Sequence, residues 1–175
     1  MIIPSKSECL AILAKNKTPS NVIGHCKAVC KVAEEIADNL IKKGIKVNKE
    51  MVIAASLLHD IEREKKNHVL EGAKLIRKMG FPEVAEVMSK HSIHKIENPV
   101  QQPHTYEEKI VFYADKRAIG GKIVSMEERF RDLKERYNID FTKEHEFAKK
   151  MEKELMVRGY IINKKPNAIN ERGKN

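Results

Sequence analysis

The chain has 175 residues, enough to bury one hydrophobic core without disulfide bonds, which predicts a single domain. Its net charge of +9 favours phosphate-bearing partners, from nucleotides to nucleic acids, but no stretch interleaves basic and aromatic residues, so a surface that stacks single strands is disfavoured. No apolar run approaches the roughly 20 residues that span a bilayer. With three cysteines and no signal peptide, we expect a soluble cytoplasmic protein with reduced thiols.

Hydrophobic periodicity predicts four helices in the first half of the chain. Ser5 and Glu8 form a capping-box pattern at the start of the first helix, and Asn48 and Asn67 occupy N-cap positions further on. Glycine follows the second and the fourth helix, where it commonly ends a helix. The expected helices cover residues 5–16, 21–43, 48–60 and 68–79, with a charged loop at 61–67.

Proline and glycine also divide the second half of the chain. Pro82 is expected to start a helix that extends through His91, and the irregular residues 92–105 are expected to form a rim or a lid. Further helices are predicted over residues 106–118, 125–136 and 142–158, the last two amphipathic and heavily charged. No alternating pattern predicts a strand. We therefore expect an all-α fold with one domain over residues 1–160 and a polar, disordered tail over residues 161–175.

An apolar stretch at residues 51–58 is followed directly by an imidazole and a carboxylate, His59 and Asp60. Because the stretch is apolar on nearly every side, it predicts a central helix wrapped by other elements. An unpaired charge at the end of such a helix is costly to bury, so this pair requires partners. Further imidazoles and a carboxylate fall on the apolar stripes of other expected helices: His25, His68, His91 and Asp115.

For any one of these six residues, a core polar side chain satisfied by a hydrogen bond is the more ordinary interpretation. Four imidazoles and two carboxylates in one interior, however, would be costly without a cation. Imidazole and carboxylate ligands without a cysteine suit one or two divalent ions such as Fe, Mn, Co, Ni, Zn or Mg. Since six ligands exceed the need of one tetrahedral ion, a two-metal centre with a shared carboxylate fits the set naturally.

The ordered pattern His25, His59-Asp60, His68, His91, Asp115 resembles the HD superfamily of metal-dependent phosphohydrolases, in its bimetallic branch. The resemblance covers roughly residues 20 to 120 and implies a helical bundle. It also implies that Asp60 bridges two ions. One ion would be held by His25, His59, Asp60 and Asp115, and the second by His68 and His91.

The sequence departs from the common HD-Ile-Gly-Lys form of the motif, because it continues Ile61-Glu62-Arg63. A glutamate replaces the glycine, and an arginine, which can meet a phosphate with a bidentate fork, replaces the lysine. No Gly-Tyr-Pro signature follows, which disfavours the cyclic-di-nucleotide branch.

The first functional hypothesis is hydrolysis of a phosphoester or phosphoanhydride of a small molecule, with a nucleotide as the expected substrate, by a metal-activated hydroxide. Asp60, Arg63 and Lys116 are the candidate catalytic residues. Arg117 is a further candidate for the phosphate, but at most one of Lys116 and Arg117 is expected to face the site. The alternatives are a di-iron oxygenase of the same superfamily and a non-catalytic, metal-stabilised module that binds nucleic acid or protein. The remaining histidines, His94, His104 and His145, are expected at the surface.

Overall fold

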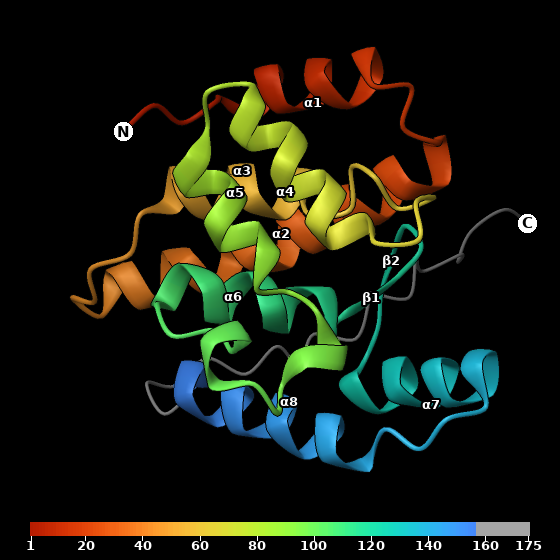
Figure 1. The fold of residues 1–175 in the computed structure, drawn as a ribbon. Coiled ribbons are helices and arrows are strands. Elements are labelled where there is room, and N and C mark those ends of the chain that lie inside the picture. Colours follow the sequence, from red (N-terminus) through yellow and green to blue (C-terminus); the bar gives the residue numbers. More distant parts are fainter. Residues whose placement is uncertain (157–175) are drawn as a thin grey trace, which may run out of the picture.

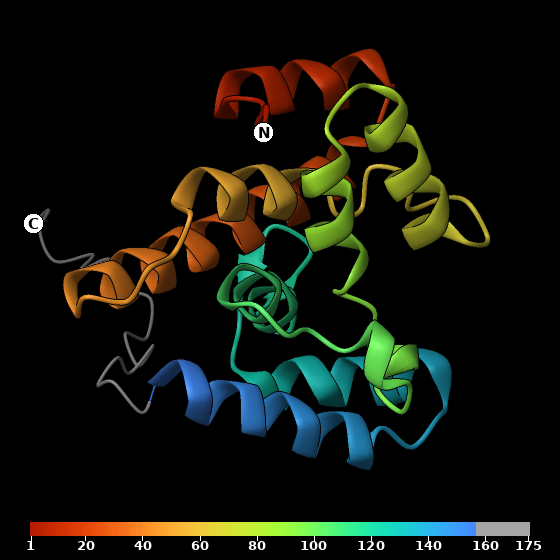
Figure 2. The same ribbon diagram turned by 60° about the vertical axis from the view of Figure 1, so that its left-hand side comes forward.

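The computed structural model describes residues 1–156, except the side chains of Lys95 and Met156, and the fold of this part is all-α, as predicted. In both ribbon views, α1 lies on one side of the molecule and the pair α7 and α8 on the opposite side (Figures 1 and 2). The elements in chain order are α1 (Lys6–Lys15), α2 (Ser20–Lys42), α3 (Lys49–Leu58), α4 (His68–Lys78), α5 (Pro82–Ser89), two 3₁₀ turns (Ile93–Lys95 and Pro99–Gln101), α6 (Tyr106–Asp115), β1 (Ala118–Ile119), β2 (Lys122–Ile123), α7 (Met126–Tyr137) and α8 (Thr142–Met156).

Helices α2, α3 and α6 contact one another and form the centre of the fold. The apolar stretch predicted to be wrapped on all sides is α3, in which seven of ten residues are buried. One hydrophobic cluster joins α2 and α6 to α7 and α8, and a second joins α1 and α3 to α4 and α5. The candidate ligands lie on the central helices or directly after them, except His68 and His91, which lie at the start of α4 and just after α5.

Several predicted helix boundaries are confirmed by their caps. Ser5 and Glu8 form the expected capping box, and the Asn48 side chain accepts a hydrogen bond from the backbone N–H of Met51 at 3.0 Å. Asn67 does stand immediately before α4, but its side chain makes no capping hydrogen bond.

Three of the expected helices are too long. The central helix, expected to carry His59 and Asp60, ends at Leu58, and both residues lie in the turn that follows it. The helix begun by Pro82 ends at Ser89, so His91 lies two residues beyond it, and the backbone N–H groups of Lys90 and His91 bond to Val87 and Met88 in a closing turn. The helix expected to reach residue 118 ends at Asp115, because the chain turns there into a small antiparallel hairpin in which Ala118 pairs with Ile123.

The hairpin was not predicted from the sequence. Its strands have two residues each, too few for an alternating pattern, and they are joined by Gly120 and Gly121. Gly120 has a φ of +51°, a backbone conformation that glycine adopts without the steric cost of a side chain.

Three expectations concern the C-terminal residues, membrane spanning and the cysteines. The predicted tail over residues 161–175, the upper end of the predicted domain and the last residues of the final helix all lie outside the described residues. Within residues 1–156, no helix has both the length and the apolar character needed to cross a bilayer. The three cysteines are buried free thiols.

Candidate metal centre

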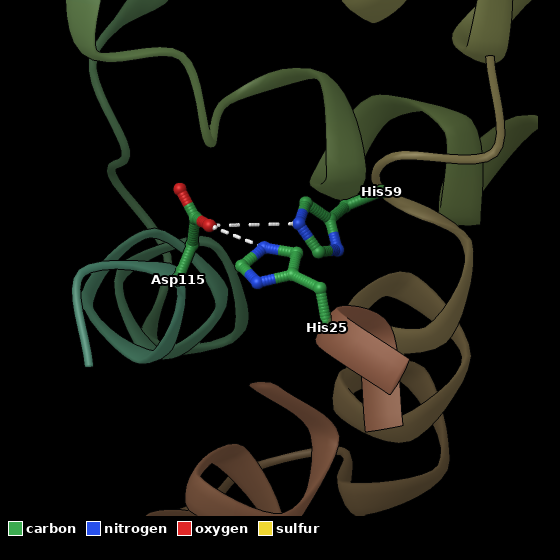
Figure 3. A group of neighbouring side chains, drawn as sticks. All are labelled: His25, His59 and Asp115. Atoms are coloured by element: carbon green, nitrogen blue, oxygen red, sulfur yellow. Dashed lines mark hydrogen bonds and ion pairs between the residues drawn. The ribbon is translucent and has the colours of Figure 1, made fainter. Parts of the chain in front are cut away.

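Three side chains from the three central helices meet at one point. His25 projects from the second turn of α2, His59 is the C-cap residue of α3, and Asp115 is the last residue of α6. The Oδ1 atom of Asp115 lies 2.9 Å from Nε2 of His25 and 3.6 Å from Nε2 of His59 (Figure 3). The structure thus brings together two imidazoles and one carboxylate that are up to 90 residues apart in sequence.

The second carboxylate, Asp60, lies between two pairs of imidazoles. Its Oδ2 atom is 3.9 Å from Nε2 of His25 and 3.7 Å from Nε2 of His59. Its Oδ1 atom is 3.4 Å from Nε2 of His68 and 3.6 Å from Nε2 of His91. This is the arrangement that a carboxylate shared between two cation sites requires, so all six residues of the predicted set converge.

Backbone carbonyls fix the orientation of two of the rings. Nδ1 of His59 donates to the carbonyl of Ser56 at 2.8 Å, and Nδ1 of His91 donates to the carbonyl of Met88 at 2.6 Å. Because a carbonyl can only accept, these bonds place the proton on Nδ1 of a neutral ring and leave the Nε2 lone pair facing the carboxylates. Such outer contacts are typical of metal-binding histidines.

Two buried polar atoms at this point have no hydrogen-bond partner among the described residues. They are Nε2 of His59, whose side chain is fully buried, and Oδ1 of Asp60. Burying a polar group without a partner costs about 1–3 kcal/mol in proteins. A bound cation would remove that cost for both atoms. The residues present therefore fit one or two divalent ions, with donors of the imidazole and carboxylate type.

The electrostatic environment keeps most of these groups in the protonation state that binds a metal, which is the deprotonated carboxylate or the neutral imidazole. Burial alone would raise the pKa of Asp60 and Asp115, but the surrounding imidazoles and cations hold the pKa of both carboxyl groups well below the ordinary range. Burial lowers the pKa of His68 to about 4 and also lowers that of His91. His59 differs, because its carboxylate neighbours outweigh burial and raise its pKa.

The three basic candidates occupy different positions. Arg63 lies at the centre, with Nη1 3.0 Å from Nε2 of His68 and 3.6 Å from Oδ1 of Asp60. The Lys116 side chain is buried, and its Nζ donates to Oδ2 of Asp115 at 2.5 Å. Arg117 donates to the carbonyl of Val124 and to the Tyr113 hydroxyl. As expected, no more than one of these two neighbours, Lys116, reaches the centre.

Sequence reasoning missed two arginines of α7. Arg129 is buried, with Nη2 3.9 Å from Oδ1 of Asp115, and Arg136 lies two helical turns further along. A signal was present, because Arg129 falls on the apolar stripe of its helix, beside Phe130 and between Met126 and Leu133. The same rule that identified the histidines, a polar residue on a buried stripe, would have identified Arg129.

A pocket of about 160 Å³ opens onto the centre. Two of the predicted ligands, His25 and Asp60, lie in its wall, and so do three arginines. The full lining consists of Asn21, Val22, His25, Asp60, Arg63, Gly120, Arg129 and Arg136.

The remaining histidines lie away from the centre. His94 and His104 are exposed, as expected. The expectation for His145 was wrong, because its ring is half-buried and stacks on Phe130 with the ring centroids 4.4 Å apart. The charged α8 packs against the core through this face, which the sequence pattern did not reveal.

Several curated proteins are similar in sequence to this chain, among them the following three. It is 33% identical over 143 residues to a Methanocaldococcus jannaschii protein named uncharacterized protein MJ0778, a match that covers 74% of this chain and 84% of that protein. It is 31% identical over 140 and 141 residues to tRNA (cytidine(56)-2'-O)-methyltransferases of Picrophilus torridus and Thermoplasma volcanium, matches that cover 72% and 73% of this chain. The chain spans 40% of the length of each methyltransferase. No solved structure gives a significant match.

The family comparison agrees with the ordered set of histidines and aspartates. A family model described as HD domain matches residues 22–119, which include all six residues of the candidate metal centre and Arg63. The match covers more than half of the sequence, and the chain therefore belongs to the HD domain family.

Proposed function

We propose that this protein is a metal-dependent phosphohydrolase that cleaves a phosphoester or phosphoanhydride bond of a small molecule, with a nucleotide as the expected substrate. The observation that carries the proposal is the position of Asp60, whose two oxygens face two separate pairs of imidazoles in a buried centre. Membership of the HD domain family and the basic wall of the adjoining pocket support it.

Bound divalent ions would supply positive charge for phosphoryl oxygens and would lower the pKa of a water molecule toward neutrality. The candidate ligands for them are His25, His59, Asp60, His68, His91 and Asp115. The chain itself would contribute positioning. Lys116 holds one oxygen of Asp115 and leaves the other facing the imidazoles, while Arg63, half-buried at the pocket, can donate to a phosphoryl oxygen.

The decisive experiment joins metal analysis to a substrate panel. Protein purified without chelator is analysed for bound metals and then assayed for phosphate release from phosphorylated metabolites, with and without oxygen. We expect bound divalent metal and turnover that does not need oxygen. Mutating even an outer contact of a metal site lowers metal affinity or activity roughly 10- to 100-fold. His91→Ala, which removes a candidate ligand, should therefore lower metal affinity or turnover by at least that factor.

The matched control is His104→Ala, which removes an exposed histidine whose Nε2 contacts the carbonyl of Pro99. This variant should retain the metal content and the turnover of the wild type. Equal loss in both histidine variants would refute the assignment of the centre. Turnover that requires iron and oxygen would replace the hydrolase with the oxygenase alternative.

A second candidate function is the binding of RNA. It is favoured by the similarity to part of two tRNA methyltransferases and by the net charge of +9. Binding of tRNA that weakens steeply with salt and survives His59→Ala would support this candidate, because phosphate contacts depend on released counterions and not on the centre. Absence of tRNA binding at low salt would contradict it.

A further inference from the structure

The pocket beside the metal centre has a basic wall, and its arginines are not among the candidate metal ligands. Helix α7 contributes Arg129 and Arg136 to this wall, and Arg63 lies in the same pocket. The two residues of α7 are seven positions apart, which places them on the same face of the helix. The ligands His25 and Asp60 line the pocket as well, so this wall and the centre share one space.

Arg129 is held in an unusual state for an arginine. Its side chain is 8% exposed, and its Nε has no hydrogen-bond partner among residues 1–156. A buried guanidinium with an unused donor is costly, and an anion is the partner that relieves such a cost. The nearest carboxylate of the centre, Asp115, is 3.9 Å from Nη2, so this arginine borders the candidate ligands directly.

One carboxylate serves both arginines of the wall. Oδ2 of Asp132 accepts from Nη1 of Arg129 at 3.3 Å and also from Nη2 of Arg136. Two guanidinium groups provide ten N–H donors between them, far more than one carboxylate can accept. The cluster therefore keeps a net positive charge and free donor capacity beside the pocket.

The first turn of α2 adds to the positive potential of the same pocket. Asn21 and Val22 line it, and they belong to the beginning of a 23-residue helix. The N-cap residue, Pro19, makes no side-chain capping bond, and the first turn holds no acidic residue. The unpaired N–H groups at such a helix end favour an anion.

From these features we infer that the α7 wall is a second phosphate subsite, formed by Arg129 and Arg136 with the first turn of α2. This inference rests on the proposed hydrolase function and narrows its substrate class. The substrate carries two adjacent phosphoryl groups, as in a nucleoside diphosphate or triphosphate or another phosphoanhydride. One group lies at the metal centre and its neighbour lies against the two arginines.

The subsite also gives the arginines a part in the reaction. The oxygen of water bonds to the phosphorus at the centre, and the bond from this phosphorus to the bridging oxygen breaks. The bonding pair leaves on the bridging oxygen and becomes negative charge on the neighbouring phosphate, while the proton of water passes to solvent. Guanidinium groups beside the leaving phosphate stabilise this charge as it develops.

The test measures binding without turnover. Full-length protein loaded with Mn²⁺ and freed of unbound ion is titrated by calorimetry with inorganic phosphate and with methylenediphosphonate, which has two phosphoryl groups and no bond that water can cleave under these conditions. Because hydrogen bonds to charged groups are stronger than those between neutral groups, the wild type should bind the diphosphonate at least about tenfold more tightly than phosphate.

Arg136→Gln is the informative variant, because its side chain is 44% exposed and its loss leaves the core intact. It should reduce diphosphonate affinity about tenfold and change phosphate affinity much less. The matched control is Arg131→Gln, which removes the same charge from an exposed position of the same helix that does not line the pocket. Arg129→Gln, checked for folding by circular dichroism, should lose at least as much as Arg136→Gln.

Two results would overturn the subsite: equal affinity of the wild type for both anions, or equal losses in Arg136→Gln and Arg131→Gln. The outcome is separable from that of the proposed function. If the preference for diphosphonate and its selective loss in Arg136→Gln both hold but no phosphoester or phosphoanhydride is cleaved, the subsite stands and the hydrolase proposal fails. If monoesters are cleaved and the preference is absent, the subsite alone fails.

Discussion

Replacing Lys116 by methionine should destabilise the protein strongly, because this lysine is a buried partner of a buried carboxylate. Its side chain is 3% exposed, and Nζ donates to Oδ2 of Asp115 at 2.5 Å and to the carbonyl of His91 at 3.0 Å. Methionine fills a similar volume but leaves both acceptors without this donor. Removing one partner of a buried ion pair costs about 3–5 kcal/mol in the free energy of unfolding.

For a chain of this size, each kcal/mol shifts the melting temperature by about 2–4 °C, so Lys116→Met should melt roughly 6–20 °C lower than the wild type. Thermal unfolding in EDTA, followed by far-UV circular dichroism, measures the shift. The control is Lys109→Met in α6, the helix that Lys116 follows, where Nζ pairs with Glu154 at 2.6 Å in a partly exposed ion pair worth about 1 kcal/mol. Equal shifts in the two variants would refute the assignment of Lys116 as the positioning residue of Asp115.

Three further predictions concern metal binding, thiol chemistry and helix capping. Arg63→Ala should tighten binding of a second Mn²⁺ about tenfold in equilibrium dialysis, because Nη1 of Arg63 lies 3.0 Å from Nε2 of His68 and competes for its lone pair; weaker binding would contradict this. Burial raises the pKa of Cys9 and Cys30 to about 12, so neither thiol should react with a disulfide reagent in the native protein near pH 8, and rapid labelling would disprove their burial. Asn48→Ala should lower the free energy of unfolding by about 1 kcal/mol in urea, since its side chain caps α3, and an unchanged midpoint would exclude that role.

Helix positions were predictable where capping and periodicity agreed, and helix ends were less so. Ser5 and Asn48 marked true starts, because their side chains bond to the first turn. The end of α5 was not readable, since apolar spacing continues through His91 while the backbone leaves the helix at Ser89. A residue can keep the register of a buried stripe in a turn that follows the helix, so periodicity placed the His91 side chain correctly and its backbone wrongly.

The candidate site was predictable to the extent that polar residues stand out against an apolar background. His25, His59 and Asp115 were identifiable for this reason, although they come from three different helices. Arg129 was overlooked because α7 is rich in charge and arginine is usually solvated on such a helix, so one buried member was not conspicuous. Its register on the apolar stripe separates Arg129 from the exposed Arg131 on the same helix, but only the packing of α7 places it beside the centre.

The division between the family match and the rest of the chain has a functional consequence. The match ends at residue 119, so it contains the candidate ligands and Arg63 but not α7, which begins at Met126. If the ligands supply the chemistry and Arg129 and Arg136 select the substrate, then the chemistry belongs to the shared region and the selection to a helix outside it. HD domain proteins with the same ligand set but a different helix in this place should therefore hold metal in the same way and prefer different phosphorylated substrates, because the anion contacts beyond the centre would change while the centre would not.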